Sequence, residues 1–175
     1  MLIVLLSSAL FLLVIVCMKP LLIGIVSPAN FLARKLAAAY WFQQTVWSSL
    51  FLFLLNALLF SATAAILFIL SYAFIPFLHL PVMIGAVLCS LFSWISIYHA
   101  DRKSRKQRLV MAGLGSSFYL CLFAFITYRI FTPIIGTEIS EQDDFMEFIG
   151  LFFMGLVSLT AWFVCLLITG IYRKE

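Results

Sequence analysis

Residues 48–100 read SSLFLFLLNALLFSATAAILFILSYAFIPFLHLPVMIGAVLCSLFSWISIYHA, a stretch that contains no charged residue and that Pro76 and Pro81 interrupt. The hydrocarbon core of a bilayer is about 30 Å thick, so one helical crossing needs about 20 apolar residues. This stretch is too long for one crossing. Because proline disfavours continuation of a helix and restricts the residue before it, we expect two transmembrane helices, at about residues 49–75 and 81–98. They would form a hydrophobic hairpin.

The composition of the whole chain predicts a membrane protein. Of its 175 residues, 65% are hydrophobic and 10% are charged, whereas soluble domains are about 45–50% apolar and about 25% charged. Only helices or closed barrels satisfy their backbone hydrogen bonds in lipid. Barrel strands alternate apolar and polar residues, but residues 50–60 are apolar except for Asn56. We therefore predict an all-α, polytopic transmembrane helical bundle without a soluble domain.

Outward from the hairpin, three more apolar stretches predict spans at about residues 1–19, 109–134 and 148–171, which gives five spans. A four-span bundle is the second choice, with residues 1–27 in the interface or re-entering the membrane. Between the first two spans, Ser27-Pro28 is typical of a helix start. Residues 28–45 therefore predict an interfacial amphipathic helix, with an ordinary connecting loop as the alternative.

The charged residues provide an independent test of this topology. Basic residues gather in three places, namely Arg34 and Lys35, the loop at residues 99–108, and Arg173 and Lys174, whereas most acidic residues lie in residues 136–147. Cytoplasmic loops carry an excess of lysine and arginine. We therefore expect a cytoplasmic loop at 99–108, an acidic outer loop at 136–147, an outer N-terminus and a cytoplasmic C-terminus. The bacterial inner (plasma) membrane is the expected location.

Small and polar residues within the spans predict where helices pack. Close helix approach in membranes uses small residues four apart, and a polar side chain in lipid needs a partner. The amide of Asn56 is the strongest such candidate. The expected packing residues are Asn56, Thr63, Gly113, Gly115, Ser116 and Ser117, within the pairs Ala112-xxx-Ser116 and Gly113-xxx-Ser117. Packing within one chain and packing between copies both remain open.

No catalytic, cofactor or metal constellation is expected. The cysteines at 17, 89, 121 and 165 lie in different predicted spans and form no C-x-x-C pair, which favours buried apolar thiols. His99 and Asp101 form an H-x-D pattern, but a site needs a third converging group. The acidic loop lacks the pattern of a calcium loop. No acid is expected at mid-membrane, which disfavours ion-coupled transport by this chain alone.

These observations favour a non-enzymatic membrane subunit, an oligomeric anchor or sensor that couples to a cytosolic partner. In a bacterium it would suit an accessory subunit or an immunity or defence complex. An oligomeric pore or small-solute transporter is the first alternative, and an intramembrane lipid-modifying enzyme the second. Direct nucleic-acid binding and cofactors are not expected. The residues predicted to dock the partner or anionic lipid are Arg102, Lys103, Arg105, Lys106 and Arg108.

Overall fold

The computed structural model describes residues 27, 30–73, 76–132 and 141–171, with the side chains of 141–144 left aside. This part of the chain is all-helical and contains no strand. Four of its helices are long and apolar enough to cross a membrane. The predicted all-α transmembrane bundle is therefore confirmed. The span expected at 1–19 lies outside the described residues, so the described part matches the four crossings of the second choice.

The first two long helices form the hairpin that the sequence predicts. Helix α3 runs from Thr45 to Tyr72 and helix α4 from His79 to Ala100, with a short 3-10 helix (η2, Pro76–Leu78) between them. Pro81 lies in the first turn of α4, where its missing N–H has no intrahelical partner to lose. The helix accordingly begins before this proline, and the prolines mark the turn rather than the helix boundary itself.

The other two long helices form the second pair. Helix α5 runs from Arg105 to Phe131, and helix α6 runs from Glu141 to Leu166 and continues as a π-helical turn (η3, Leu167–Ile171). The start of α5 and the start of α6 both differ from the prediction, because each helix begins earlier than expected. The expected loop at 99–108 narrows to residues 101–104 because Ser104 and Gln107 cap α5, and the expected outer loop at 136–147 is helical from residue 141 onward.

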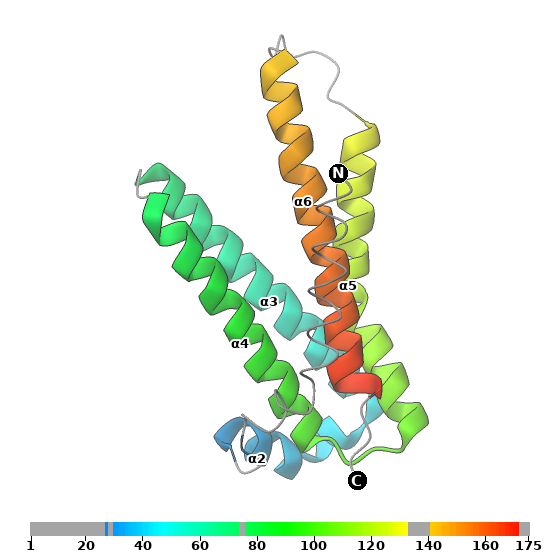
Figure 1. Cartoon of the computed structure of the whole chain (residues 1–175). Coiled ribbons are helices and arrows are strands. Elements are labelled where there is room, and N and C mark those ends of the chain that lie inside the picture. The colour runs from blue at the N-terminus through cyan, green and yellow to red at the C-terminus, as the bar shows by residue number, and fades with distance from the viewer. Residues whose placement is uncertain (1–26, 28–29, 74–75, 133–140, 172–175) are drawn as a thin grey trace.

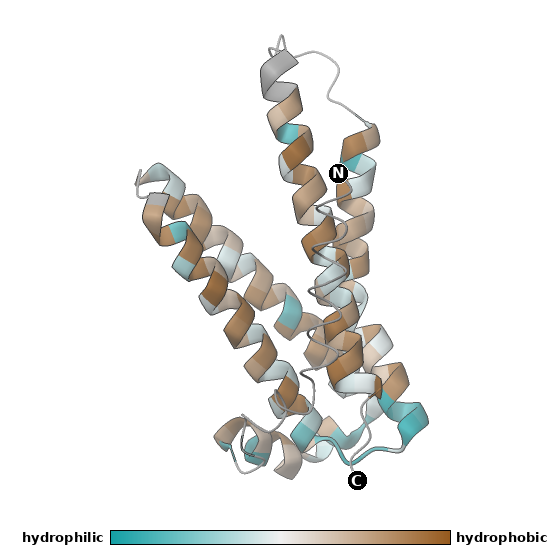
Figure 2. Ribbon diagram, viewed as in Figure 1, coloured by the Kyte–Doolittle hydropathy of each residue, from teal (hydrophilic) through white to brown (hydrophobic). Residues whose placement is uncertain are grey.

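The two pairs converge at the end of the bundle where α4 meets α5 and diverge toward the other end (Figure 1). We call the first of these the basic end, because it holds residues 101–104, the start of α5 and helix α2. Helix α2 (Phe31–Ala38) and a short 3-10 helix (η1, Tyr40–Gln43) pack there before α3 begins. Hydrophobic residues cover the long helices, and hydrophilic ones gather around the α4–α5 connection (Figure 2).

Helix α2 takes the place of the amphipathic helix expected at 28–45, but it begins later than Ser27-Pro28 suggests. Its N-cap is Asn30, whose Oδ1 accepts a hydrogen bond from the backbone N–H of Ala33 at 2.6 Å. The side chains of Ala33 and Leu36 are buried, whereas Phe31, Arg34 and Lys35 are exposed. The helix therefore packs one face on the bundle and leaves the opposite face open.

Burial is uneven along the bundle. The core lies toward the basic end, where Leu52, Trp94, Met111 and Ile168 are buried together with other apolar side chains. Toward the divergent end, the side chains of α3 beyond residue 60 and most of those in the first half of α4 are exposed or half-buried. In a bilayer these apolar side chains meet lipid or another protein rather than water.

Candidate functional site

A buried carboxylate organises the basic end. Asp101 follows the last residue of α4, and its side chain is fully buried. Its Oδ2 accepts a hydrogen bond from Nε of Arg108 at 2.8 Å, and its Oδ1 accepts one from Nζ of Lys103 at 3.1 Å. The same Oδ1 accepts the backbone N–H of Lys103 at 3.3 Å, as in an Asx turn. One carboxylate thus pairs with two cations and shapes the connection between α4 and α5.

The two paired cations also contact the surrounding elements. Nζ of Lys103 donates to the carbonyl oxygen of Phe42 at 2.8 Å and lies 4.8 Å from the centre of the Phe42 ring. The guanidinium of Arg108 lies 5.8 Å from the centre of the Tyr98 ring. Lys103 therefore ties the connection to η1, and Arg108 ties α5 to α4. The charged groups of Lys103 and Arg108 thus contact other elements of the bundle, and the docking role expected for the five basic residues stays a prediction.

The other three cations of the predicted docking set face outward. Arg102, Arg105 and Lys106 are exposed, whereas the side chains of Lys103 and Arg108 are only 2% and 10% exposed. Arg105 and Lys106 occupy the first turn of α5, which contains no acidic residue. A helix N-terminus carries a partial positive charge of its own. The exposed part of this connection is consequently a concentrated positive surface on a structured platform, suited to an anionic partner.

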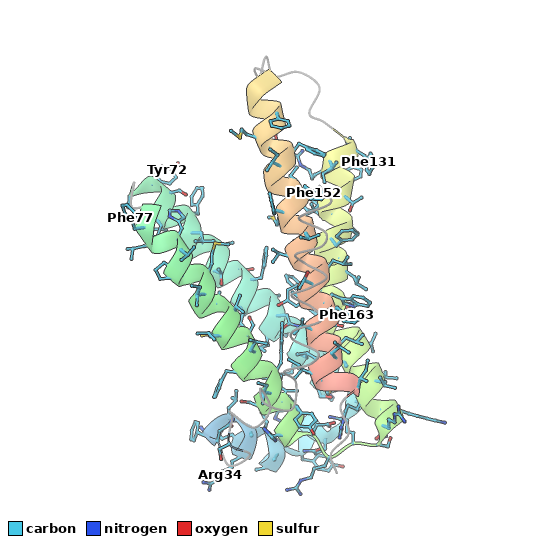
Figure 3. The ribbon with its side chains drawn as sticks, in the orientation of Figure 1. Arg34, Tyr72, Phe77, Phe131, Phe152 and Phe163 are labelled. Carbon is cyan, nitrogen blue, oxygen red and sulfur yellow. The ribbon has the colours of Figure 1, made fainter. Side chains whose placement is uncertain are left out.

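Helix α2 is held against the same end by polar contacts. Nδ2 of Asn30 donates to Oγ of Ser96 in α4 at 2.9 Å. The side-chain amide of Gln43 donates to the carbonyl oxygens of Ala37 and Ala100 at 3.4 Å. These bonds fix α2 and η1 near the final turns of α4. Arg34, on the open face of α2, points away from the bundle (Figure 3).

The second polar cluster lies inside the helix bundle, around Asn56. Its Oδ1 accepts the indole N–H of Trp94 at 2.8 Å, and its Nδ2 donates to the carbonyl oxygen of Gly115 at 3.2 Å and to Sγ of Cys165 at 3.8 Å. Asn56 is fully buried. The amide therefore connects α3 to α4, α5 and α6. This arrangement supplies the partners that an amide in lipid requires, and all of them belong to the same chain.

The predicted small residues of α5 separate into two faces. On one face, Ser116 is buried and a Cβ added at Gly115 would lie 2.5 Å from Cδ2 of Leu52. On the other, a Cβ added at Gly113 would meet no atom within 4 Å, and Ser117 donates only to its own helix, at the carbonyl oxygen of Leu114. Close approach of α3 and α5 thus uses Gly115. Ser116 is also buried, whereas Gly113 meets no neighbour and Ser117 bonds its own helix.

Thr63 also lies away from the polar cluster. Its hydroxyl donates to the carbonyl oxygen of Leu59 in its own helix at 2.7 Å, and it joins no other element through that bond. A contact that the sequence pattern did not single out lies at the end of the bundle instead. A Cβ added at Gly170 would lie 2.8 Å from Cβ of Ala112, so η3 approaches α5 closely there.

The residues considered for metal or thiol chemistry do not assemble in the described part of the chain. There, no group of three or more histidine, cysteine or acidic side chains is arranged to hold a metal ion. Cys89 and Cys121 are exposed and Cys165 is buried, while Cys17 lies outside the described residues. His79 and His99 lie in the first and last turns of α4. Both polar clusters described above join helices to one another, through Asp101 at the basic end and through Asn56 inside the bundle.

The described geometry defines a polytopic helical membrane protein with a positive surface at one end. No protein-family model, no curated protein and no solved structure matches the chain. Arguments about its role therefore depend on its own residues.

Proposed function

We propose that this chain is a non-enzymatic membrane subunit, an anchor or sensor that couples the bilayer to a cytosolic partner. The observation that carries the proposal is the α4–α5 connection with the first turn of α5, which we call the platform and which exposes Arg102, Arg105 and Lys106 at the basic end. There the buried Asp101 holds Lys103 and Arg108 inside the fold, and three cations remain exposed. A fixed connection presents its charges with less loss of conformational freedom on binding than a flexible loop would.

The partner should carry an acidic surface. Arg102, Arg105 and Lys106 are exposed and sit beside the positive end of the α5 dipole. Complementary charge speeds encounter and selects among partners. Under the positive-inside rule this end faces the cytoplasm, where a soluble protein can reach it. In a bacterium, such a subunit fits an accessory role in a larger complex, including an immunity or defence complex.

Assembly with further membrane-embedded chains is the second part of the proposal. Along the divergent end, α3 and α4 pack on each other while most of their side chains remain open. Ser61, Ala62, Ala64 and Ala65 are among these exposed residues of α3, and small residues permit close approach of another helix. Another copy of the chain or a different membrane subunit would cover this surface.

A native mass measurement tests the proposal. The protein is purified without crosslinker in mild detergent and in nanodiscs, and the mass of the particle is determined. We expect a homo-oligomer or a stoichiometric complex with a second protein. A monomer without a bound protein under both conditions would overturn the proposal.

The role of the platform is tested by replacing its exposed cations. The triple variant Arg102→Gln, Arg105→Gln, Lys106→Gln should lose the cytosolic protein while keeping its membrane-embedded assembly. Arg129→Gln is the matched control, because it removes a cation at the opposite end of α5. Equal recovery of the partner with the triple variant and with the control would contradict the assigned docking surface.

A further inference from the structure

The open face of α2 is a second charged surface, separate from the α4–α5 connection. Phe31, Arg34, Lys35 and Ala38 are exposed, and at helical spacing they share one side of the helix. Nζ of Lys35 lies 4.4 Å from the centre of the Phe31 ring. The opposite side contains Ala33 and Leu36, which are buried against the bundle. This face thus combines two cations with an aromatic ring, and no element among the described residues covers it.

The position of α2 along α4 defines the depth of this face in the membrane. Helix α4 has 22 residues, so its length of about 33 Å is close to the thickness of the hydrocarbon core, about 30 Å. Asn30 binds Ser96, which precedes the end of α4 by four residues, or about 6 Å along the axis. The N-terminus of α2 therefore lies within about 6 Å of the boundary between the apolar core and the headgroups, the depth at which interfacial helices lie.

Exposed aromatic side chains mark the same boundary. Tyr40 and Trp41 of η1 and Trp47 in the first turn of α3 are all exposed. Tryptophan and tyrosine are enriched at membrane–water interfaces, where an apolar ring meets a polar edge. The aromatic residues follow α2 directly in the chain, so the cations of α2 and this aromatic belt belong to one interfacial layer.

Charge decides what this layer binds. The first 100 residues contain no aspartate or glutamate, so neither α2 nor the segments that follow it, through α4, supply an acid to neutralise Arg34 and Lys35. The first acid, Asp101, is fully buried between Lys103 and Arg108. Lipid headgroups are the ligands that reach this depth, and anionic headgroups offer the complementary charge.

We propose that the open face of α2 binds anionic phospholipid headgroups through Arg34 and Lys35, with Phe31 inserted toward the acyl chains. The side chains match this role, because arginine binds phosphate through a planar fork and lysine binds it as a point charge. The long stems of both residues reach along the boundary toward the headgroups. Lipid binding by α2 would then hold the α3–α4 hairpin at a fixed depth in one leaflet of the membrane.

Lipid retention tests this proposal. The protein is reconstituted in nanodiscs that contain phosphatidylcholine and phosphatidylglycerol, and retained lipids are identified by native mass spectrometry after transfer to mild detergent. We expect preferential retention of phosphatidylglycerol, which weakens at high salt. Arg34→Gln with Lys35→Gln should reduce phosphatidylglycerol affinity by about fivefold per residue, or about 30-fold together.

Two further variants distinguish charge from folding. Arg34→Lys with Lys35→Arg keeps both charges and should retain the preference, whereas Arg129→Gln removes a cation far from α2 and should leave it unchanged. If the double glutamine variant does not fold, Arg34→Gln alone and a salt titration of the natural protein decide the question. Equal retention of both lipids by the natural protein would overturn the proposal, as would equal effects of the α2 variants and Arg129→Gln. An acidic protein that binds α2 while the lipids do not would also overturn it.

Discussion

At the scale of single residues, Asn56 provides the contact shared by all four long helices. The indole N–H of Trp94 can only donate, so the oxygen of the Asn56 amide must face it, and the amide nitrogen is left for Gly115 and Cys165. Only one orientation of the Asn56 amide therefore gives hydrogen-bond partners to both its oxygen and its nitrogen. This constraint fixes α3 in rotation and in height against α4, α5 and α6.

Replacement of Asn56 by leucine should lower the free energy of unfolding by about 1–2 kcal/mol. The variant removes bonds between helices and leaves the buried Trp94 N–H without its acceptor. Circular dichroism during titration with sodium dodecyl sulfate measures this stability. Thr63→Val is the matched control, since the Thr63 hydroxyl bonds only its own helix and its loss should have little effect. Equal stabilities of the two variants would contradict the bridging role of Asn56.

Gly115 and Gly113 form a matched pair in the same helix. Gly115→Ala should destabilise the bundle by about 1–3 kcal/mol, because the new methyl group overlaps the buried Leu52 side chain and forces α3 and α5 apart. Gly113→Ala meets open space and should be neutral or slightly stabilising, since alanine favours helix. The same detergent titration compares them, and Leu52→Ala should partly rescue Gly115→Ala. A more harmful substitution at Gly113 would refute this assignment of faces.

At the scale of elements, the connection between α4 and α5 shows what sequence could and could not predict. Hydropathy located both helices, because crossing a bilayer imposes length and composition directly. It could not reveal that Lys103 and Arg108 are engaged inside the fold. Their pairing depends on the three-dimensional convergence of α4, α5 and η1 on Asp101, and the pattern of charges alone looked like a uniformly exposed loop.

The same reasoning applies to the helix-packing residues. A small-xxx-small pattern appears twice in α5, in overlapping positions, and the sequence does not indicate which pair faces a neighbour. The buried pair is Ala112-xxx-Ser116, and Ala112 lies against Gly170 of η3. The neighbouring Gly115 lies against Leu52 of α3, whereas Gly113 meets no neighbour. For Asn56, in contrast, the cost of an unpaired amide in lipid predicted a partner, although it could not identify Trp94, Gly115 and Cys165 as the partners.

Asp101→Asn should destabilise the protein by about 3–5 kcal/mol. The change removes the carboxylate that pairs with the buried side chains of Arg108 and Lys103, and loss of one partner from a buried ion pair is costly. Thermal unfolding in nanodiscs measures the effect. Glu147→Gln is the control, because its pair with Arg129 is largely exposed and its loss should cost less than about 1 kcal/mol. Similar unfolding temperatures for the two variants would show that Asp101 does not organise the connection.

At the scale of the whole molecule, the two helix pairs pack together at one end only. They share a packed core at the basic end, and the hairpin of α3 and α4 departs from α5 and α6 toward the other end (Figure 1). Aromatic residues stand at that divergent end, with Tyr72 and Phe77 at the tip of the hairpin and Phe131 at the end of α5 (Figure 3). The exposed cations Arg102, Arg105 and Lys106 thus lie at the end with the packed core, and most of the exposed apolar surface of α3 and α4 lies toward the divergent end.

The crossing of α5 provides a decisive test of this arrangement. Its 27 residues extend about 40 Å, enough to cross the hydrocarbon core, so Arg102 and Met146 should lie on opposite sides of the membrane. In a variant with Cys17, Cys89 and Cys121 replaced by serine, Arg102→Cys and Met146→Cys are introduced separately and treated with an impermeant thiol reagent in sealed vesicles of known orientation. We expect the cysteine at 102 to react only from the cytoplasmic side and the one at 146 only from the outer side. Labelling of both cysteines from one side would mean that α5 does not cross the membrane. The proposed roles of the platform and of the lipid-binding face would then fail, because both depend on this topology.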